Sequence, residues 1–302
     1  MGNFSTMYEP EAIGRQYSSR IMLYLESRED LEIFHERWFR GWSEWIEFQS
    51  VDAQEGGGGG SSQVFHRVQK DRDCNVPAFG IVDRDVLLND QVMGRGSNWD
   101  AFLESNHAAF ESAAHVGPYI KVLRRWEIEN YLLHPVAVGK LMQDAEVKSN
   151  VTCSPNAAAQ CLLDFSAVAI LMTAANLVLI EHDRIPIKPL FEQNYSDIQS
   201  LTPLVIRYFE TQGISDAQEK IDIKCKAIRS FLHDETGTPE DHWDQLNYLI
   251  DGKLFLVRFC KWFGFSDPRR LELARKICDH QLIDSEISEF MRMLKEKAIK
   301  LG

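Results

Sequence analysis

The fold of this chain is restricted most by one pattern, in which short apolar segments alternate with longer segments of helical periodicity. Residues 20–25 (RIMLYL) and 78–82 (AFGIV) carry no charge after Arg20, and residues 119–123 (YIKVL) begin a third such segment. Apolar runs of this length are typical of strands buried on both faces of a parallel sheet. Since strands that alternate with helices form a sheet covered by those helices, we expect an α/β fold with a mostly parallel sheet flanked by helices.

The segments between these strands carry helical patterns. Residues 26–45 place large apolar side chains at helical spacing, which indicates core packing: Leu31, Phe34, Trp38, Trp42 and Trp45. Residues 45–51 (WIEFQSV) are a further strand candidate, and residues 63–70 and 98–114 are helix candidates. The glycines at 56–60 predict a flexible loop, because no Gly-Lys-Ser/Thr follows them to form a phosphate-binding loop.

The character of the chain changes after Pro135. Five segments there have helical patterns: residues 157–180, 198–211, 216–233, 241–264 and 268–300. We therefore expect an α/β domain at residues 1–140 and a helical domain at residues 141–302. Residues 165–180 are uncharged, but a membrane span needs about 20 apolar residues, so a buried core helix is expected. Residues 1–20 lack the apolar stretch of a signal peptide, which predicts a cytoplasmic protein without a membrane partner.

The composition restricts the classes of protein to be considered. Of 302 residues, 44% are hydrophobic and 26% are charged, as in a soluble globular protein. The six cysteines form no CxxC pair, which argues against a zinc site and a disulfide framework. The net charge of −12 argues against a protein that coats nucleic acid non-specifically. It does not exclude a nuclease, because carboxylates that bind cations add to the negative charge of the metal-free chain.

Acidic residues follow all three apolar segments. Glu26 follows the first, Asp83 and Asp85 follow the second, and Glu127 and Glu129 lie in the continuation of the third. In open α/β sheets, ligands bind beyond the carboxyl ends of the strands, and acids at three such ends would meet there. Each pair is two residues apart, so in an extended chain its members point to one side.

A crowd of carboxylates needs cations to offset its own repulsion. Asp30 lies four residues after Glu26, one helical turn on, and adds a sixth acid. Hard oxygen ligands suit Mg²⁺ or Mn²⁺, and two such ions stabilise the attacking and leaving oxygens of a displacement at phosphorus. Taken alone, each pair is better explained as solvated surface charge. Their joint appearance predicts a two-ion phosphodiesterase site formed by Glu26, Asp30, Asp83, Asp85, Glu127 and Glu129.

At these residues the chain resembles TOPRIM domains. Residues 25–30 (LESRED) are similar to the family's E-G-x-x-D opening, with Ser27 in place of the usual glycine. Residues 81–85 (IVDRD) are similar to its DxD motif. Residues 125–133 (RWEIENYLL), with a proline two positions later, resemble a more specific stretch of the OLD-like TOPRIM proteins of bacterial defence systems.

The helical half adds a weaker likeness. Gly252-Lys253 resembles the G-K element that the OLD-like proteins carry there, and the overall layout is similar to that of the TOPRIM nuclease effectors of PARIS anti-phage systems. The resemblance implies a TOPRIM-like fold in residues 1–140 and a metal-dependent endonuclease whose catalytic residues are Glu26, Asp83, Asp85 and Lys253. Glu127 and Glu129 would complete or support the metal site. Lys253 would contact phosphate or stabilise developing charge, although its sequence context alone suits an ordinary lysine at a helix start.

The resemblance also implies partners. Effectors of this kind are held by an ABC-type ATPase, are released by a phage-encoded trigger protein, and then dimerise and cleave host tRNA. Residues 141–302 would serve partner docking, dimerisation and substrate contacts. Two alternatives stay open: an OLD-like DNA endonuclease or nickase, and a non-catalytic interaction module.

Basic residues lie close to the acidic motifs. Lys121, Arg124 and Arg125 stand beside the third acidic segment. They are candidates for contacts with a nucleic-acid backbone. Pairing of Arg125 with a neighbouring carboxylate is the alternative, and the sequence does not separate the two.

Overall fold

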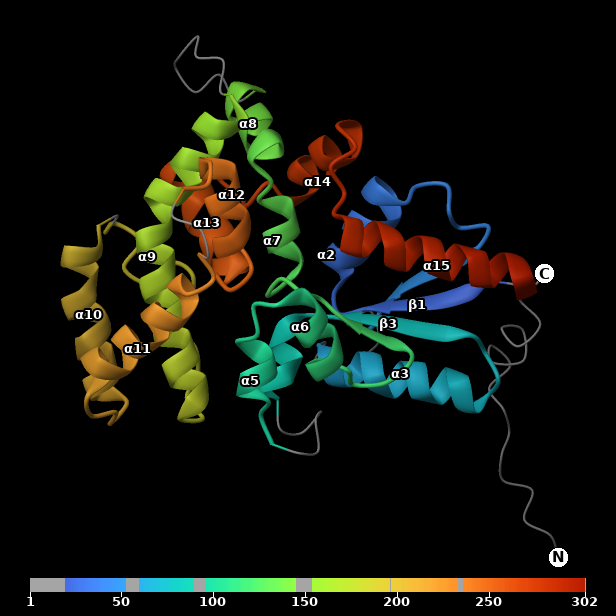
Figure 1. The fold of residues 1–302 in the computed structure, drawn as a ribbon, viewed down its shortest axis with the longest axis horizontal. Coiled ribbons are helices and arrows are strands. Elements are labelled where there is room, and N and C mark those ends of the chain that lie inside the picture. Colours follow the sequence, from blue (N-terminus) through green and yellow to red (C-terminus); the bar gives the residue numbers. More distant parts are fainter. Residues whose placement is uncertain are drawn as a thin grey trace, which may run out of the picture.

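The computed structural model of the chain describes residues 20–52, 60–89, 96–144, 154–195, 197–232 and 236–301. Four strands form one sheet in the order β2-β1-β3-β4, and each neighbouring pair is parallel. The strands are β1 (Ile21–Leu25), β2 (Ile46–Ser50), β3 (Ala78–Val82) and β4 (Ile120–Val122). Every residue of β1 and β3 is buried, which explains their continuous apolar sequences. The predicted parallel sheet flanked by helices is confirmed (Figure 1).

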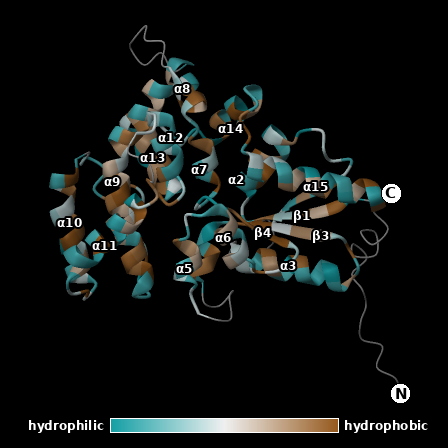
Figure 2. Cartoon of the chain, viewed as in Figure 1, coloured by the Kyte–Doolittle hydropathy of each residue, from teal (hydrophilic) through white to brown (hydrophobic). Residues whose placement is uncertain are grey.

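Helices cover both faces of the sheet. α3 (Ser61–Asp73) packs on β3 and β1, and the C-terminal α15 (Ser285–Leu301) packs on β1 and β2 from the other side (Figure 1). Gly80 lets α3 approach, because a Cβ there would lie 2.4 Å from a methyl carbon of Val64. Hydrophobic residues follow the strands, and hydrophilic residues occupy the exposed parts of α3 and α15 (Figure 2).

The helix expected over residues 26–45 is shorter and irregular. α2 (Arg28–Leu31) continues into a π-helical segment, η1 (Glu32–Trp38), and the chain then turns into β2. Core packing of the apolar stripe is confirmed, because Phe34 and Trp38 are buried and the other three members pack against the core. The indole nitrogen of Trp38 donates to the carbonyl of Ala274, which ties this segment to the C-terminal part of the chain.

Short helices connect the rest of the sheet. The structure places the 3₁₀ helix η2 (Arg84–Leu88) after β3, then α5 (Trp99–Phe102), α6 (His107–Ala113) and, after β4, α7 (Ile128–Leu132). The single helix expected over residues 98–114 is therefore wrong. Asn106 interrupts it, because its side chain accepts from the backbone N–H of Ala109 and caps a new helix.

The second half is helical, as predicted. Its elements are α8 (Pro135–Asp144), α9 (Pro155–Glu181), α10 (Ile198–Thr211), α11 (Ala217–Arg229), α12 (Pro239–Leu246), α13 (Gly252–Trp262), α14 (Arg270–Asp279) and α15. The segments 241–264 and 268–300, expected as single helices, are each two helices. Asp251 caps α13 by accepting from the N–H of Leu254, and Gln281, with a φ of 57°, lies in the turn between α14 and α15.

α9 forms the centre of the helical half and packs on α8, α10, α11, α12 and α13. By length and composition it is apolar enough to cross a membrane, but 78% of its most apolar window is buried inside the protein. The expected core helix at residues 165–180 is thus confirmed. α14 and α15 leave this half and return to η1 and the sheet, so the two halves share one core. The boundary at residue 140 stays a prediction.

Candidate functional site

The strand order creates a crevice beside Glu26 and Asp83. After β1 the chain moves to β2 on one side, and β3 is added on the other side of β1. Such a switch point is where open α/β sheets bind ligands, beyond the carboxyl ends of the strands. Glu26 directly follows β1, and Asp83 directly follows β3. The backbone N–H of Asp83 donates to the Glu26 carboxylate at 2.9 Å, although the two residues are 57 positions apart.

A pocket of about 350 Å³ opens at this point. Five of the six acids that the sequence singled out line it, namely Glu26, Asp30, Asp83, Glu127 and Glu129. Glu29 and Asp52 bring the lining carboxylates to seven, against the two cationic side chains of Lys253 and Arg270. The formal balance of the pocket is therefore −5, from seven negative and two positive groups.

Ser27 explains how Asp30 is held. Its side chain accepts from the N–H of Asp30 at 3.1 Å, and its own N–H donates to the Asp30 carboxylate at 3.1 Å, which forms a capping box at the start of α2. Its φ of −132° is ordinary for an L-residue. The serine found where TOPRIM sequences usually have glycine therefore fits the turn without strain.

Glu127 and Glu129 reach the pocket by a route the sequence did not predict. β4 ends at Val122, and of the two acids Glu127 has extended backbone angles whereas Glu129 is helical. Glu127 is the N-cap of α7, and its N–H donates to Asn130 Oδ1 at 3.0 Å. Glu129 lies in the first turn of α7 and is buried. The expectation that both point to one side of a strand is wrong, because the helix starts between them.

Asp85 is also not extended. Asp83 keeps extended backbone angles as the N-cap of η2, and Asp85 lies inside that 3₁₀ helix. Asp85 is exposed and does not line the pocket, but its charge is close enough to raise the pKa of Glu26. The intervening Arg84 is buried and fixes the turn. Its guanidinium donates to the carbonyls of Phe102 and Glu104 at 2.9 and 2.7 Å, and also to that of Arg124.

Burial and mutual repulsion disfavour the charged forms of these acids. Burial, followed by the charge of Asp85, raises the pKa of Glu26 to about 8. Burial and the charge of Asp30 raise the pKa of Glu129 to about 7. Loss of solvation, followed by the charge of Asp251, raises the pKa of Asp85 to about 6. The pKa values of Asp83 and Glu127 also rise well above their ordinary range, chiefly through burial.

Gly252-Lys253 places the N-terminus of α13 and the lysine side chain beside these acids. Gly252 begins α13 so close to α7 that a Cβ on it would lie 2.5 Å from Asn130 Oδ1. The next residue, Lys253, donates its backbone N–H to the Glu127 carboxylate. Its side chain lines the pocket, where Glu129 and Glu127 outweigh the effect of burial and raise the pKa of the amine. An N-terminal helix turn that faces a carboxylate is favourable.

Replacing Gly252 by alanine is expected to lower the free energy of unfolding by about 1–3 kcal/mol, because the new methyl group overpacks against Asn130. The same methyl group should move the backbone N–H of Lys253 away from the Glu127 carboxylate. Gly80→Ala is the matched control, since it overpacks at 2.4 Å from Val64 outside the pocket. Urea unfolding measures the loss of stability in each of the two variants. Only Gly252→Ala should also alter divalent-ion binding by the folded protein, and equal ion binding in both variants would contradict this prediction.

Three site residues were missed by sequence reasoning. Asp251 caps α13, accepts from Asn176 Nδ2 at 3.3 Å, and its charge raises the pKa of Asp85 and Glu127. Arg84 appeared only as the spacer of the DxD motif. Arg270, at the start of α14, forms ion pairs with Glu29 and Glu129. The position of Asp251 next to Gly252-Lys253 was a usable signal, whereas no local pattern marks Arg270.

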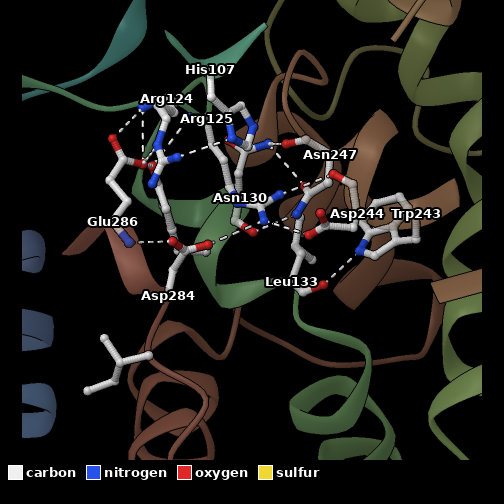
Figure 3. Close-up of polar contacts among 12 residues, drawn as sticks. His107, Arg124, Arg125, Asn130, Leu133, Trp243, Asp244, Asn247, Asp284 and Glu286 are labelled. Atoms are coloured by element: carbon white, nitrogen blue, oxygen red, sulfur yellow. Dashed lines mark hydrogen bonds and ion pairs between the residues drawn. The ribbon is translucent and has the colours of Figure 1, made fainter. Parts of the chain in front are cut away.

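The three basic residues Lys121, Arg124 and Arg125 lie against carboxylates of this chain. Figure 3 shows Arg124 beside Glu286, and Arg125 between Asp244 and Asp284. Arg125 is buried and pairs with Asp244 at 2.6 Å and Asp284 at 3.4 Å. Lys121 and Arg124 both pair with the buried Glu286, at 2.9 and 3.3 Å. The carboxylate-paired alternative for Arg125 is thus what the structure contains, and nucleic-acid contacts by the three residues stay a prediction.

The donor chemistry of the pocket fits divalent cations. Among the described residues, no three His, Cys, Asp or Glu side chains are close enough together to hold a metal ion as they stand. The lining nevertheless offers hard carboxylate oxygens, an excess negative charge of five and raised pKa values, all of which a cation would offset. Binding would require carboxylates such as Glu26 and Asp83 to close around the ion.

Comparisons with protein-family models, with curated proteins and with solved structures find no match for this chain.

Proposed function

We propose that this chain is a TOPRIM-type, divalent-metal-dependent endoribonuclease that cleaves host tRNA in anti-phage defence. One observation carries the proposal. Glu26 and Asp83, from separate strand ends, are in direct contact at the switch point of a parallel sheet, in a pocket that five more acids, Lys253 and Arg270 also line. The same residues carry the likeness to OLD-like TOPRIM proteins and to AriB, the TOPRIM effector of PARIS.

In this proposal, Glu26, Asp30, Asp83, Glu127 and Glu129, which line the pocket, provide ligands for two Mg²⁺ or Mn²⁺ ions, and Asp85, which does not line it in the metal-free chain, would be the sixth ligand. Bound there, the ions would activate the attacking oxygen and neutralise the leaving one. The chain itself orients the acids: the N–H of Asp83 fixes Glu26, the Ser27 capping box fixes Asp30, and the N–H of Lys253 fixes Glu127. The ammonium group of Lys253 would hold a phosphate oxygen or stabilise its developing charge.

The partners belong to the same proposal and rest on the resemblance. An ABC-type ATPase would hold the protein inactive, a phage-encoded trigger would release it, and the freed chain would form a homodimer. The helical half exposes large apolar side chains that suit a protein contact, among them Ile185, Ile223 and Trp262, at 81%, 56% and 53% exposure.

Incubation of the purified chain with total RNA and with supercoiled plasmid, each with Mg²⁺, Mn²⁺ or EDTA, tests the substrate. We expect tRNA fragments with either ion and none with EDTA. Sequencing of the RNA ends would then give the cleavage position. If plasmid is cut while RNA stays intact, the OLD-like DNA endonuclease replaces the tRNA assignment. If neither is cut, also when the chain is activated in cells, the non-catalytic interaction module is the better description.

A further inference from the structure

Arg270 enters the acidic pocket from a helix far away in the sequence. It is the first residue of α14, directly after Arg269, whose φ of 51° turns the chain into the helix. α14 packs on η1, α7 and α8, so its position is fixed by several elements. The side chain of Arg270 is 12% exposed and lines the pocket beside Glu129 and Lys253.

The guanidinium of Arg270 lies between a deep acid and a rim acid. One terminal nitrogen pairs with Glu129, whose side chain is 4% exposed, and the other pairs with Glu29, whose side chain is 61% exposed. The Nε atom is buried and has no hydrogen-bond partner in the part of the chain that the structure describes. Ion pairs with exposed acids are weak. Arg270 therefore has one donor without a partner, and its outer partner, Glu29, is held loosely.

We propose that Arg270 is a substrate-binding residue that holds a backbone phosphate of the nucleic acid, and this inference rests on the proposed function. A phosphodiester that enters a pocket with a formal charge of −5 meets repulsion, and Lys253 and Arg270 are the two cationic side chains in its lining. A planar guanidinium with parallel N–H groups suits phosphate oxygens better than an ammonium does.

In this inference Arg270 has two alternative partners, Glu129 and the phosphate, and Glu129 controls the exchange between them. In the metal-free chain, Glu129 is paired with Arg270. Once Glu129 shares its charge with a divalent cation, its attraction for Arg270 weakens, and the guanidinium is free to turn to the phosphate. The ion pair thus offsets the charge of Glu129 in the metal-free chain, and Arg270 would exchange this partner for a phosphate when metal and substrate are bound.

A second hollow borders the acidic pocket at Arg270. This hollow, about 400 Å³ in volume, shares Glu29 and Arg270 with the acidic pocket, and its other lining residues are Glu32, Asp267, Pro268, Arg269, Leu271 and Glu272. Arg270 therefore stands on the border between the two hollows. Since carboxylates outnumber arginines in both linings, Arg270 is placed where a phosphate next to the acids needs a cationic partner.

Binding of fluorescein-labelled tRNA in Ca²⁺, measured by anisotropy at several salt concentrations, tests the role of Arg270 in the full chain. Arg270→Gln is expected to weaken binding about tenfold and to lower the slope of log K against log salt by about 1, as for a lost phosphate contact. Arg270→Lys should keep the slope with intermediate affinity. Arg275→Gln is the matched control, because it removes the same charge from an exposed position on α14 and should leave the slope unchanged.

Mn²⁺ binding and thermal unfolding separate substrate contact from a structural role. Arg270→Gln should bind Mn²⁺ as tightly as the parent or more tightly, since a competing cation is removed. A loss of Mn²⁺ affinity or of the fold, with the salt slope unchanged, would overturn the inference. If the parent chain binds neither tRNA nor Mn²⁺, the proposed function itself fails. If the parent binds both and Arg270→Gln is indistinguishable from it, only the role of Arg270 fails.

Discussion

Replacing Glu26 by glutamine is expected to abolish the proposed phosphodiesterase activity, by about 10³-fold or more, while raising the melting temperature of the metal-free protein. The activity falls because a carboxylate at the switch point is lost as a cation ligand. The stability rises because glutamine keeps the size of the side chain but removes a charge that burial and Asp85 disfavour.

The pH dependence of this stabilisation follows from the pKa of Glu26. That pKa is about 8 in the folded protein against an ordinary value of 4.5, so between these values the folded chain keeps a proton that the unfolded chain releases. The charge of Glu26 therefore costs the parent protein no stability below about pH 4.5, and the stability of the parent falls as the pH rises towards 8. The advantage of Glu26→Gln should therefore be absent at pH 4 and largest above pH 8.

Thermal unfolding in EDTA over this pH range and RNA cleavage in Mg²⁺ measure the two effects. Glu36→Gln is the matched control, because Glu36 lies on η1 with half of its side chain exposed and should change neither property. Retained cleavage by a folded Glu26→Gln protein would remove Glu26 from the catalytic machinery. An unchanged melting temperature at pH 8 would show that the charge of Glu26 is already compensated.

Replacing Arg84 by methionine is expected to lower the free energy of unfolding by about 3–5 kcal/mol, the largest stability effect we predict for a single side chain. Methionine fills part of the space but donates nothing, so the buried carbonyls of Phe102, Glu104 and Arg124 lose their partner. The ring of Phe110, 4.3 Å from the guanidinium carbon, also loses its cation.

Denaturant unfolding of Arg84→Met measures this cost, with Arg28→Met as the control. The side chain of Arg28 is 78% exposed, and its ion-pair partner among the described residues is Glu32, so its loss should cost less than about 1 kcal/mol. Arg84 also orients the turn between Asp83 and Asp85, so the folded fraction of Arg84→Met should lose activity. Similar stabilities of the two variants would show that Arg84 is not required to hold this turn.

The two central strands, β1 and β3, were predictable because they are buried on both faces. Burial of both faces leaves an unbroken apolar run, as in β3, and the acids that follow such runs mark the carboxyl edge. The convergence of Glu26 and Asp83 therefore follows from sequence pattern and topology alone. Residues 1–19, 53–59 and 233–235 lie outside the described residues, and with them most of the predicted glycine loop.

The rest of the site depends on contacts without a local signal. The helical turn at Glu127 results from capping by Asn130, which in turn is held by the carbonyls of Asn247 and Ile250 at 2.9 and 2.8 Å. Interactions more than a hundred residues apart leave no periodicity to read. For the same reason, the return of α14 and α15 to the sheet, and the arrival of Arg270 beside Glu129, became visible only in three dimensions.

The long separation between Glu127 and Lys253, which are 126 positions apart and joined by a hydrogen bond, affects how the protein is made. A ribosome that has completed the strands still holds a chain without α13, α14 and α15. Such a nascent chain has one face of β1 uncovered and a pocket that lacks both of its basic side chains. Under the proposed function, the chain would thus become competent only after α13 and α14 have been synthesised, and products that end before them would lack both basic side chains of the pocket.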